Sequence, residues 1–306
     1  MLRSVILAAS RSARVERLVE TVPLTRGVVD RFVPGTGTAD ALRATTELVG
    51  QNLAVSLDYL GEDTTTPAQA DATRDEYLGL LSALGAAELT PAAEVSVKLS
   101  ALGQVFDEKL AEEGARAICA RASEVGTTVT LDMEEHATTD STLEVLNRLR
   151  ADFPTVGVAV QAYLRRAEAD CRELAVAGSR VRLCKGAYDE PESVAFQSRL
   201  DVDRSYVRCL NILMSGPGYP MIATHDPRLV AIGEDRAKWF DRSADEFEFQ
   251  LLYGVRPEEQ LRLAAAGYTV RVYVPYGTQW YPYLMRRLAE RPANVAFFAR
   301  ALRSRK

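Results

Sequence analysis

The sequence is poor in the features that assign many proteins to a class at sight. Its four cysteines lie far apart, with neither a Cys-x-x-Cys pair nor spacing typical of zinc sites, so we expect reduced thiols and no disulfide framework. Long hydrophobic runs are also missing, because the opening "MLRSVILAASRSARVERLVE" holds only five apolar residues in a row, too few for a secretory signal or a membrane span. These absences predict a cytoplasmic protein, with any membrane contact peripheral to the inner face of the cell membrane.

An excess of positive charge is missing as well. The chain has 37 Lys and Arg against 42 Asp and Glu, whereas a nucleic-acid surface needs the opposite balance. No G-x-G-x-x-G follows the first strand-like run, no H-E-x-x-H or acidic and histidine cluster suggests a metal, and no G-x-S-x-G suggests a hydrolase. What remains is an ordinary globular composition, and we expect neither nucleic acid nor a metal as a partner.

Eight short strand-like runs alternate with longer amphipathic segments. The runs are "NLAVSLDYLG" from Asn52, "AEVSVKLSALG" from Ala93, "TTVTLDMEE" from Thr127, "VGVAVQAYL" from Val156, "SRVRLCKGAY" from Ser179, "YPMIATHD" from Tyr219, "FEFQLLYG" from Phe247 and "YTVRVYVPYG" from Tyr268. Segments with helix-start signals, such as "TTTPAQADATRDEYLGLLSAL" and "RPEEQLRLAAAG", lie between them. Strict alternation predicts parallel strands with helical crossovers.

Eight such units favour a (β/α)8 TIM barrel, and an open doubly wound sheet is the alternative. Before the first strand, a stretch of helical periodicity is interrupted by "VPGTGTAD". We therefore predict a helical arm over residues 1–50 and a barrel over residues 51–306.

Barrels of this class carry their chemistry at the C-terminal ends of the strands. Lys98 and Asp132 should point into the barrel from adjacent strands, where a carboxylate within about 4 to 6 Å keeps a buried ammonium charged. A buried ion pair that only fixes the barrel register is the alternative. Further polar residues at strand ends are Gln161, Arg182, Lys185, Thr224, His225 and Tyr273, and at Gly186 the backbone could approach a ligand closely. Many cations without a nucleophile motif indicate an anionic ligand, with an organic cofactor or a Schiff base at Lys98 or Lys185.

The C-terminal stretch "YPYLMRRLAERPANVAFFARALR" predicts one more helix. If Pro282 opens it, Tyr283, Arg286, Arg287 and Glu290 share one face. Taken alone, this face is equally consistent with a solvated helix surface holding an Arg287–Glu290 ion pair. Beside a barrel mouth already rich in charge, we expect it to lie over the site.

The ordered motifs resemble the proline dehydrogenase family. They are "SLDYLGE", "VSVKLSALG", "LDMEE", "VAVQAY", "VRLCKGAY", "ATHD", "FEFQLLYG", "RVYVPYG" and "YLMRRLAE", from about residue 52 to 300. The resemblance implies oxidation of L-proline to Δ1-pyrroline-5-carboxylate by FAD in a distorted (β/α)8 barrel whose last helix covers the mouth. It implies a monofunctional enzyme that passes electrons to a membrane quinone, with a separate pyrroline-5-carboxylate dehydrogenase downstream. A Schiff-base aldolase and a non-catalytic ligand-binding barrel are the alternatives.

The resemblance also assigns site residues. Arg286 and Arg287 would hold the substrate carboxylate together with Lys98, since a guanidinium matches a carboxylate in a two-bonded fork. Glu62 would act as a gate that pairs with the first arginine. The residues expected around the proline ring are Ala187, Tyr188, Leu252, Tyr273 and Tyr283.

For the cofactor, the resemblance gives Asp132 and Arg182 the catalytic roles. Arg182 would lie near the flavin N5, which receives a hydride from the ring carbon next to nitrogen, and a cation there stabilises the reduced state. The residues expected to bind FAD are Asp132, Met133, Gln161, Arg182, Lys185, Gly186, Ala187, Thr224, His225, Gln250, Arg287 and Glu290. Because the substrate amine must be neutral, lower pH should depress the rate.

Overall fold

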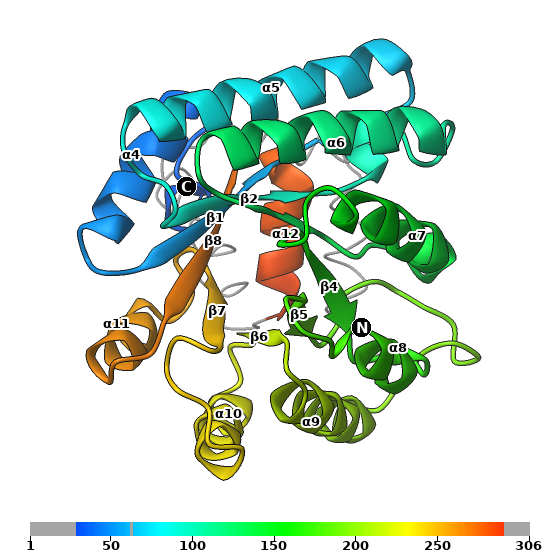
Figure 1. The fold of residues 1–306 in the computed structure, drawn as a ribbon, viewed down its shortest axis with the longest axis vertical. Helices are drawn as coiled ribbons and strands as arrows, with labels where there is room; N and C mark the ends of the chain where they lie inside the picture. The colour runs from blue at the N-terminus through cyan, green and yellow to red at the C-terminus, as the bar shows by residue number, and fades with distance from the viewer. Residues whose placement is uncertain (1–28, 62–63, 291–306) are drawn as a thin grey trace, which may run out of the picture.

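The computed structural model describes residues 29–61 and 64–290, although nothing is described of the side chains of Arg286 and of residues 288–290. Eight parallel strands close into one barrel in chain order, as Figure 1 shows. The strands are β1 Ala54–Tyr59, β2 Ala93–Val97, β3 Val129–Leu131, β4 Gly157–Gln161, β5 Arg180–Cys184, β6 Tyr219–Ala223, β7 Glu248–Leu252 and β8 Val270–Tyr276. Since β1 pairs with both β2 and β8, the predicted (β/α)8 barrel is confirmed and the open sheet is excluded.

Helices form the wall outside the strands. They are α4 Thr38–Val49, α5 Pro67–Ala86, α6 Glu108–Glu124, α7 Thr139–Arg150, α8 Ala167–Leu174, α9 Arg199–Ser215, α10 Pro227–Trp239 and α11 Pro257–Ala265. A further helix, α12 Trp280–Glu290, follows β8, and short 3-10 turns lie at η1 Ser100–Leu102 and η2 His136–Thr138. Their starts follow the sequence signals: the Thr66 side chain accepts a hydrogen bond from the Gln69 N–H, and proline opens α5. Among the residues described here, no helix combines the length and apolar character needed to cross a membrane.

Helix α4 completes the helical wall at the place where β8 pairs with β1. In Figure 1, α4 lies between α11 and α5, and its Ala41, Ala44 and Leu48 are buried in the same apolar cluster as the barrel strands. The helix before β1 therefore covers the place next to β8. The described part of the predicted arm packs as barrel wall from Thr38 onward, and the domain boundary at residue 50 stays a prediction.

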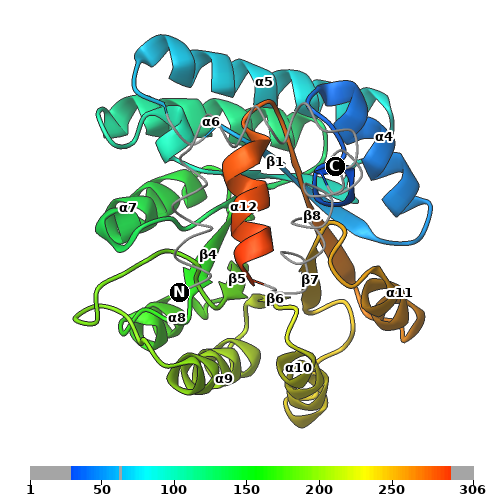
Figure 2. The ribbon, with the colours of Figure 1, turned by 180° about the vertical axis from the view of Figure 1, so that it is seen from behind.

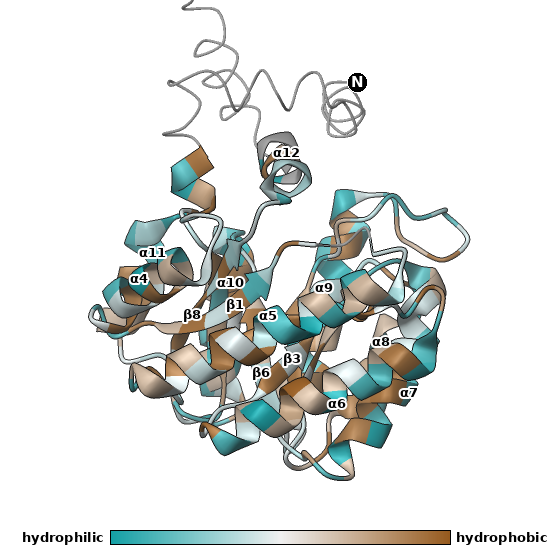
Figure 3. Cartoon of the chain, turned by 90° about the horizontal axis from the view of Figure 1, so that it is seen from above, coloured by the Kyte–Doolittle hydropathy of each residue, from teal (hydrophilic) through white to brown (hydrophobic). Residues whose placement is uncertain are grey.

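The helix that follows β8 lies over the barrel mouth instead of in the wall. Figure 2 shows α12 crossing the barrel in front of the strands, and Figure 3 shows it beyond one end of the barrel. The predicted position of this helix is confirmed. It begins at Trp280 rather than at Pro282. Pro282 is tolerated within the first helical turn, because an N–H at that position would lack an intrahelical partner in any case.

Alternate strand residues divide the barrel into an apolar outside and a polar inside. On β2, Val95 and Val97 pack outward in the apolar core, whereas Glu94 and Ser96 hydrogen-bond to side chains of neighbouring strands. The buried polar and charged residues of the eight strands are Ser56, Asp58, Glu94, Ser96, Thr130, Gln161, Arg182, Glu248, Gln250 and Arg271. The interior therefore lacks the branched aliphatic filling that usually dominates such barrels.

A separate apolar cluster seats α12. It consists of Phe32, Val33, Leu60, Tyr281, Tyr283, Leu284 and Met285. The backbone of Gly254, in the turn before α11, holds the N-terminal side of this cluster, because its carbonyl accepts a hydrogen bond of 3.2 Å from Arg31 Nε. Gly254 has a φ of +69°, and a Cβ built there would lie 1.7 Å from the Arg31 carbonyl oxygen. Only glycine allows this approach.

We expect Gly254→Ala to destabilise the protein more than Gly267→Ala. Both glycines have positive φ values, +69° and +89°, but nothing lies within 4 Å of a Cβ at Gly267. Backbone strain is thus common to both variants, and only Gly254→Ala must push Arg31 away. The difference in the free energy of unfolding, measured by urea denaturation, should be about 1 to 3 kcal/mol. Equal losses in the two variants would show that residues 29–33 do not dock on Gly254.

Candidate active site

A pair of buried opposite charges lies where β1 and β2 end. The Lys98 ammonium is 2.6 Å from each Asp58 oxygen and 3.7 Å from Asp132, and its side chain is 9% exposed. The sequence indicated Asp132 as the carboxylate that keeps Lys98 charged. That carboxylate is close, but Asp58 is the nearer partner, and sequence reasoning had not placed Asp58 in the site.

Arg182 joins this pair to the centre of the barrel. Its Nη1 donates to Asp132 at 2.5 Å and to Ser96 Oγ at 2.7 Å, and its Nη2 donates to Ser56 Oγ at 3.2 Å. Tyr273 Oη donates to the other Asp132 oxygen at 2.7 Å, and the Arg182 guanidinium lies 5.3 Å from the Tyr273 ring centroid. The structure thus brings together Lys98, Asp132, Arg182 and Tyr273 at one end of the barrel, as predicted.

The pKa values of the Asp132 and Asp58 carboxyl groups are shifted in opposite directions. Burial alone would raise the pKa of Asp132, but Arg182 and Lys98 outweigh burial and hold the pKa below its ordinary value. For Asp58, burial raises the pKa to about 6 in spite of the Lys98 ammonium, and the nearby Asp132 charge adds to the rise. As the pH falls, Asp58 therefore gains a proton before Asp132 does.

Asp58 should make the wild-type protein less stable as the pH rises from about 4 to 6. Because its pKa is higher in the folded state than the ordinary value of 3.8, the folded state binds more protons in this window, and that stabilisation is lost toward pH 6. In Asp58→Asn, the free energy of unfolding relative to wild type should rise over the same window by up to about 3 kcal/mol. Urea denaturation at several pH values measures this, and a pH-independent difference would contradict the raised pKa.

The nitrogen and the oxygen of the Gln161 side-chain amide differ in their hydrogen bonding. Its Nε2 donates to the carbonyl oxygens of Met133 at 2.7 Å and Glu134 at 2.8 Å. Its Oε1 is buried and has no hydrogen-bond partner among the described residues. A buried amide oxygen without a partner is costly, so an N–H of a bound molecule fits this position. The Met133 side chain itself packs in the barrel core.

The loop after β5 approaches the aromatic ring of Tyr163. Gly186 has a φ of +97°, and a Cβ there would lie 2.1 Å from that ring, so the backbone can lie against Tyr163 only as glycine. Lys185 does not point freely toward a ligand, because its ammonium lies 2.6 Å from Asp203 and 3.0 Å from Asp226. The predicted anion contact at this loop therefore depends on backbone more than on Lys185.

The end of β6 is tied to β7. His225 Nε2 accepts the Leu252 N–H at 2.9 Å, which makes Nδ1 the protonated nitrogen of a neutral ring. The Thr224 Oγ1 accepts from the Asp226 N–H at 3.1 Å. The Gln250 Oε1 accepts from Arg182 Nε at 2.6 Å, so this predicted cofactor residue is engaged with Arg182.

The remaining predicted residues are spread around the mouth. Ala187 is exposed, and Tyr188 packs against the small apolar cluster that contains Tyr163. On α12, Tyr283 is buried in the cluster that seats the helix, and the Arg287 guanidinium lies 5.1 Å from the Tyr283 ring centroid. Glu62 lies outside the described residues, as do the side chains of Arg286 and Glu290.

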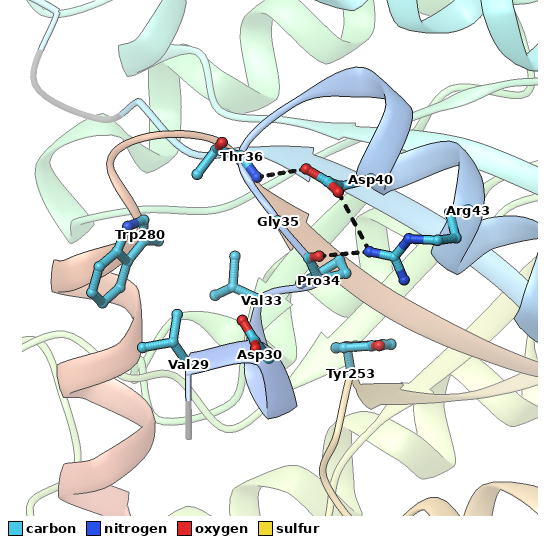
Figure 4. A pocket seen from close by; sticks show the side chains of 10 residues that line it. All are labelled: Val29, Asp30, Val33, Pro34, Gly35, Thr36, Asp40, Arg43, Tyr253 and Trp280. Carbon is cyan, nitrogen blue, oxygen red and sulfur yellow. Dashed lines mark hydrogen bonds and ion pairs between the residues drawn. The ribbon is translucent and has the colours of Figure 1, made fainter. Parts of the chain in front are cut away.

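A hollow of about 660 Å³ opens at the rim beside α12, but it is not the barrel mouth. Figure 4 shows Val33 and Trp280 on one side of it and Arg43 with Asp40 on another. The Arg43 guanidinium already donates to the Pro34 carbonyl at 3.0 Å and to Asp40 at 3.4 Å. The buried charges at the strand ends are therefore the candidate active site.

Comparisons of the sequence with a family model and with known proteins all point to one family. The family model described as "Proline dehydrogenase" matches residues 41–300. The chain is similar to "Proline dehydrogenase 1" of Bacillus subtilis, with 35% identity over 302 residues and 99% coverage of both chains. It is also similar to "Proline dehydrogenase" of Deinococcus radiodurans, with 38% identity over 309 residues, 98% coverage of this chain and 97% of that one.

Solved structures give the same result for the fold. Proline utilization A from Bdellovibrio bacteriovorus, inactivated by N-propargylglycine, superposes with a TM-score of 0.81 and 25% identity over 87% of this chain. The present chain spans only 33% of that protein. Its barrel thus corresponds to one part of a longer relative.

Proposed function

Because the chain belongs to the proline dehydrogenase family, we propose that it oxidises L-proline to Δ1-pyrroline-5-carboxylate with FAD as its cofactor. One observation carries the proposal: buried Lys98 and Arg182 meet the partly buried Asp132 and Tyr273 at the strand ends, beneath a helix that bears two arginines. This arrangement suits a small anionic substrate, because cations face it and apolar groups of α12 help to exclude water.

The side chains of the site would bind and orient the substrate. Arg287, with Arg286 beside it in sequence, would hold the carboxylate in a two-bonded fork, and Lys98 would add a third positive charge. The Tyr273 ring, oriented by its hydrogen bond to Asp132, would lie along the pyrrolidine ring together with Leu252 and Tyr283. Glu62 would close the pocket as a gate.

The residues around Arg182 fit a flavin. The buried Gln161 Oε1, which has no partner in the described part of the chain, suits the N–H of the flavin pyrimidine ring, and the Gly186 backbone would lie along the cofactor. FAD, when bound, supplies the acceptor for the hydride that leaves the ring carbon of proline. Arg182 would hold a fixed positive charge beside that acceptor, as cations do at sites of developing negative charge. The further residues proposed to bind FAD are Asp132, Met133, Lys185, Ala187, Thr224, His225, Gln250, Arg287 and Glu290.

A Schiff-base mechanism has less support from this geometry. It needs a neutral lysine amine to attack a carbonyl. Lys98 is 2.6 Å from Asp58, and Lys185 is 2.6 Å from Asp203, so each amine is paired with a carboxylate rather than placed to attack a carbonyl. Electron transfer to a membrane quinone, a cytoplasmic location with peripheral membrane contact, and a separate pyrroline-5-carboxylate dehydrogenase complete the proposal.

Anaerobic addition of L-proline to the purified protein tests the function directly. The protein should be yellow, and L-proline should bleach the flavin absorbance while a product that reacts as a cyclic imine accumulates. D-proline is the control, because a site that holds both the carboxylate and the ring distinguishes the two configurations. A colourless protein that forms a borohydride-stable adduct with substrate would establish the aldolase instead, and an unbleached yellow protein would leave only ligand binding.

A further inference from the structure

Charged side chains fill the barrel one layer beneath the site. We call Glu94, Arg180, Glu248 and Arg271 the lower layer. Glu94 and Glu248 are 1% and 0% exposed, and Arg271 is 8% exposed. Barrels of this type are usually filled at such positions by branched aliphatic side chains.

Stability does not account for this layer. Two charges brought into a protein interior lose hydration that their mutual attraction barely restores, and apolar residues of similar size are often as good or better. The lower layer is well paired, since Arg271 Nε lies 2.8 Å from Glu248 and Arg180 Nη2 lies 2.7 Å from Glu94. The role of the lower layer must therefore lie in its contacts with side chains nearer the site.

The upward connection runs through Gln250. Glu248 Oε1 accepts hydrogen bonds from Arg271 Nε and from Gln250 Nε2. The other end of the amide, Gln250 Oε1, accepts from Arg182 Nε at 2.6 Å. Arg271, Glu248, Gln250 and Arg182 therefore form one continuous chain from the lower layer to the site.

This chain determines which way the amide faces. A carboxylate can only accept hydrogen bonds, so Glu248 draws the NH2 group of Gln250 and leaves its oxygen for Arg182. A reversed amide would set two donors against each other. The Nη atoms of Arg182 are held by Ser96, Asp132 and Ser56, whereas among the described residues its Nε donates to Gln250.

We propose that Glu248 is a positioning residue for the reaction, with Arg271 as its counter-ion. It fixes the amide of Gln250 and, through it, the guanidinium plane of Arg182. The inference rests on the proposed function, because the orientation of Arg182 matters only beside a reacting substrate and flavin.

The experiment replaces the ion pair by apolar residues, in Glu248→Leu with Arg271→Met, so that the net charge stays unchanged. We expect a folded, flavin-containing protein whose kcat for L-proline falls by about tenfold, with KM changed by less than about threefold. The midpoint potential of the bound flavin should fall, because the cation beside it is no longer held in place. A pair with a purely structural role would leave both kcat and the potential as in wild type.

Three further variants make the result specific. Arg166→Gln with Asp170→Asn removes an ion pair of 2.9 Å on α8, and it should leave kcat and the potential unchanged. Glu248→Gln keeps an oxygen for both donors, so kcat should recover to within about twofold of wild type. If the apolar pair does not fold, Gln250→Leu breaks the same chain above the ion pair and must lower the potential likewise.

The outcomes separate the two proposals. A wild-type protein that binds no flavin, or that L-proline does not reduce, overturns the proposed function and this inference with it. A wild-type protein that is bleached normally, together with an apolar-pair variant of unchanged kcat and potential, overturns the inference alone.

Discussion

Arg182→Gln should lower kcat for L-proline by roughly two to three orders of magnitude, the effect seen when one group that stabilises developing charge at a reacting centre is removed. The guanidinium lies 2.5 Å from Asp132 and the residue is 5% exposed, so glutamine can replace neither the charge of Arg182 nor its fork of donors. The midpoint potential of the flavin should fall as well. A variant with wild-type potential would contradict the placement of Arg182 beside the cofactor.

The same substitution should cost stability, and a control separates the two effects. Loss of Arg182 leaves Asp132 without its nearest cation, which is worth about 3 to 5 kcal/mol for a buried charge. Arg180→Gln, on the same strand, leaves Glu94 without its partner at 2.7 Å but keeps the contacts of Asp132. It should be similarly destabilised and retain most of its activity. If both variants lose activity equally, unfolding explains the loss.

Arg287→Lys should reduce kcat/KM for L-proline by about 30-fold, or about 2 kcal/mol, chiefly through KM. Arg287 is half-buried on α12, and its guanidinium lies over the Tyr283 ring at 5.1 Å from the centroid. Lysine keeps the positive charge but cannot make two parallel hydrogen bonds to a carboxylate or stack on the ring. Steady-state kinetics over a range of proline concentrations measures the change.

The matched control is Arg262→Lys. Arg262 on α11 pairs at the surface with Glu234 and Glu259, with a side chain that is 47% exposed. The same exchange there should leave kcat/KM unchanged, because exposed ion pairs contribute little. Unchanged kinetics in Arg287→Lys would remove Arg287 from the substrate contacts.

The barrel could be predicted because each of its strands carries a local signal. The period-two pattern of β2 correctly separated the outward Val95 and Val97 from the inward Ser96 and Lys98, and β1 pairs with β8 as strict alternation implied. The helix start at Thr66 was readable because the Thr66 side chain caps the backbone locally. Local patterns of this kind need no knowledge of distant contacts.

Contacts between strands could not be predicted in the same way. The pattern of Ser56 and Asp58 on β1 resembles that of Ser96 and Lys98 on β2, but only the register, which sets Asp58 opposite Ser96, brings Asp58 to Lys98. The ion pair between Glu94 on β2 and Arg180 on β5 crosses the barrel interior, and no spacing of residues along the chain predicts it. The roles assigned to the site residues stay predictions until the variants are measured.

The place of α4 in the wall has a consequence for protein synthesis. This helix covers the strand that is made last, and the hydrogen bond from Arg271 Nη1 to the Val55 carbonyl spans 216 residues. At about 5 to 20 residues per second, a ribosome needs about ten seconds or more to add the chain between α4 and β8. During that time the apolar face of α4 has no β8 to cover and stays exposed. The emerging polypeptide is therefore most prone to aggregation, and most dependent on chaperones, before its last strand appears.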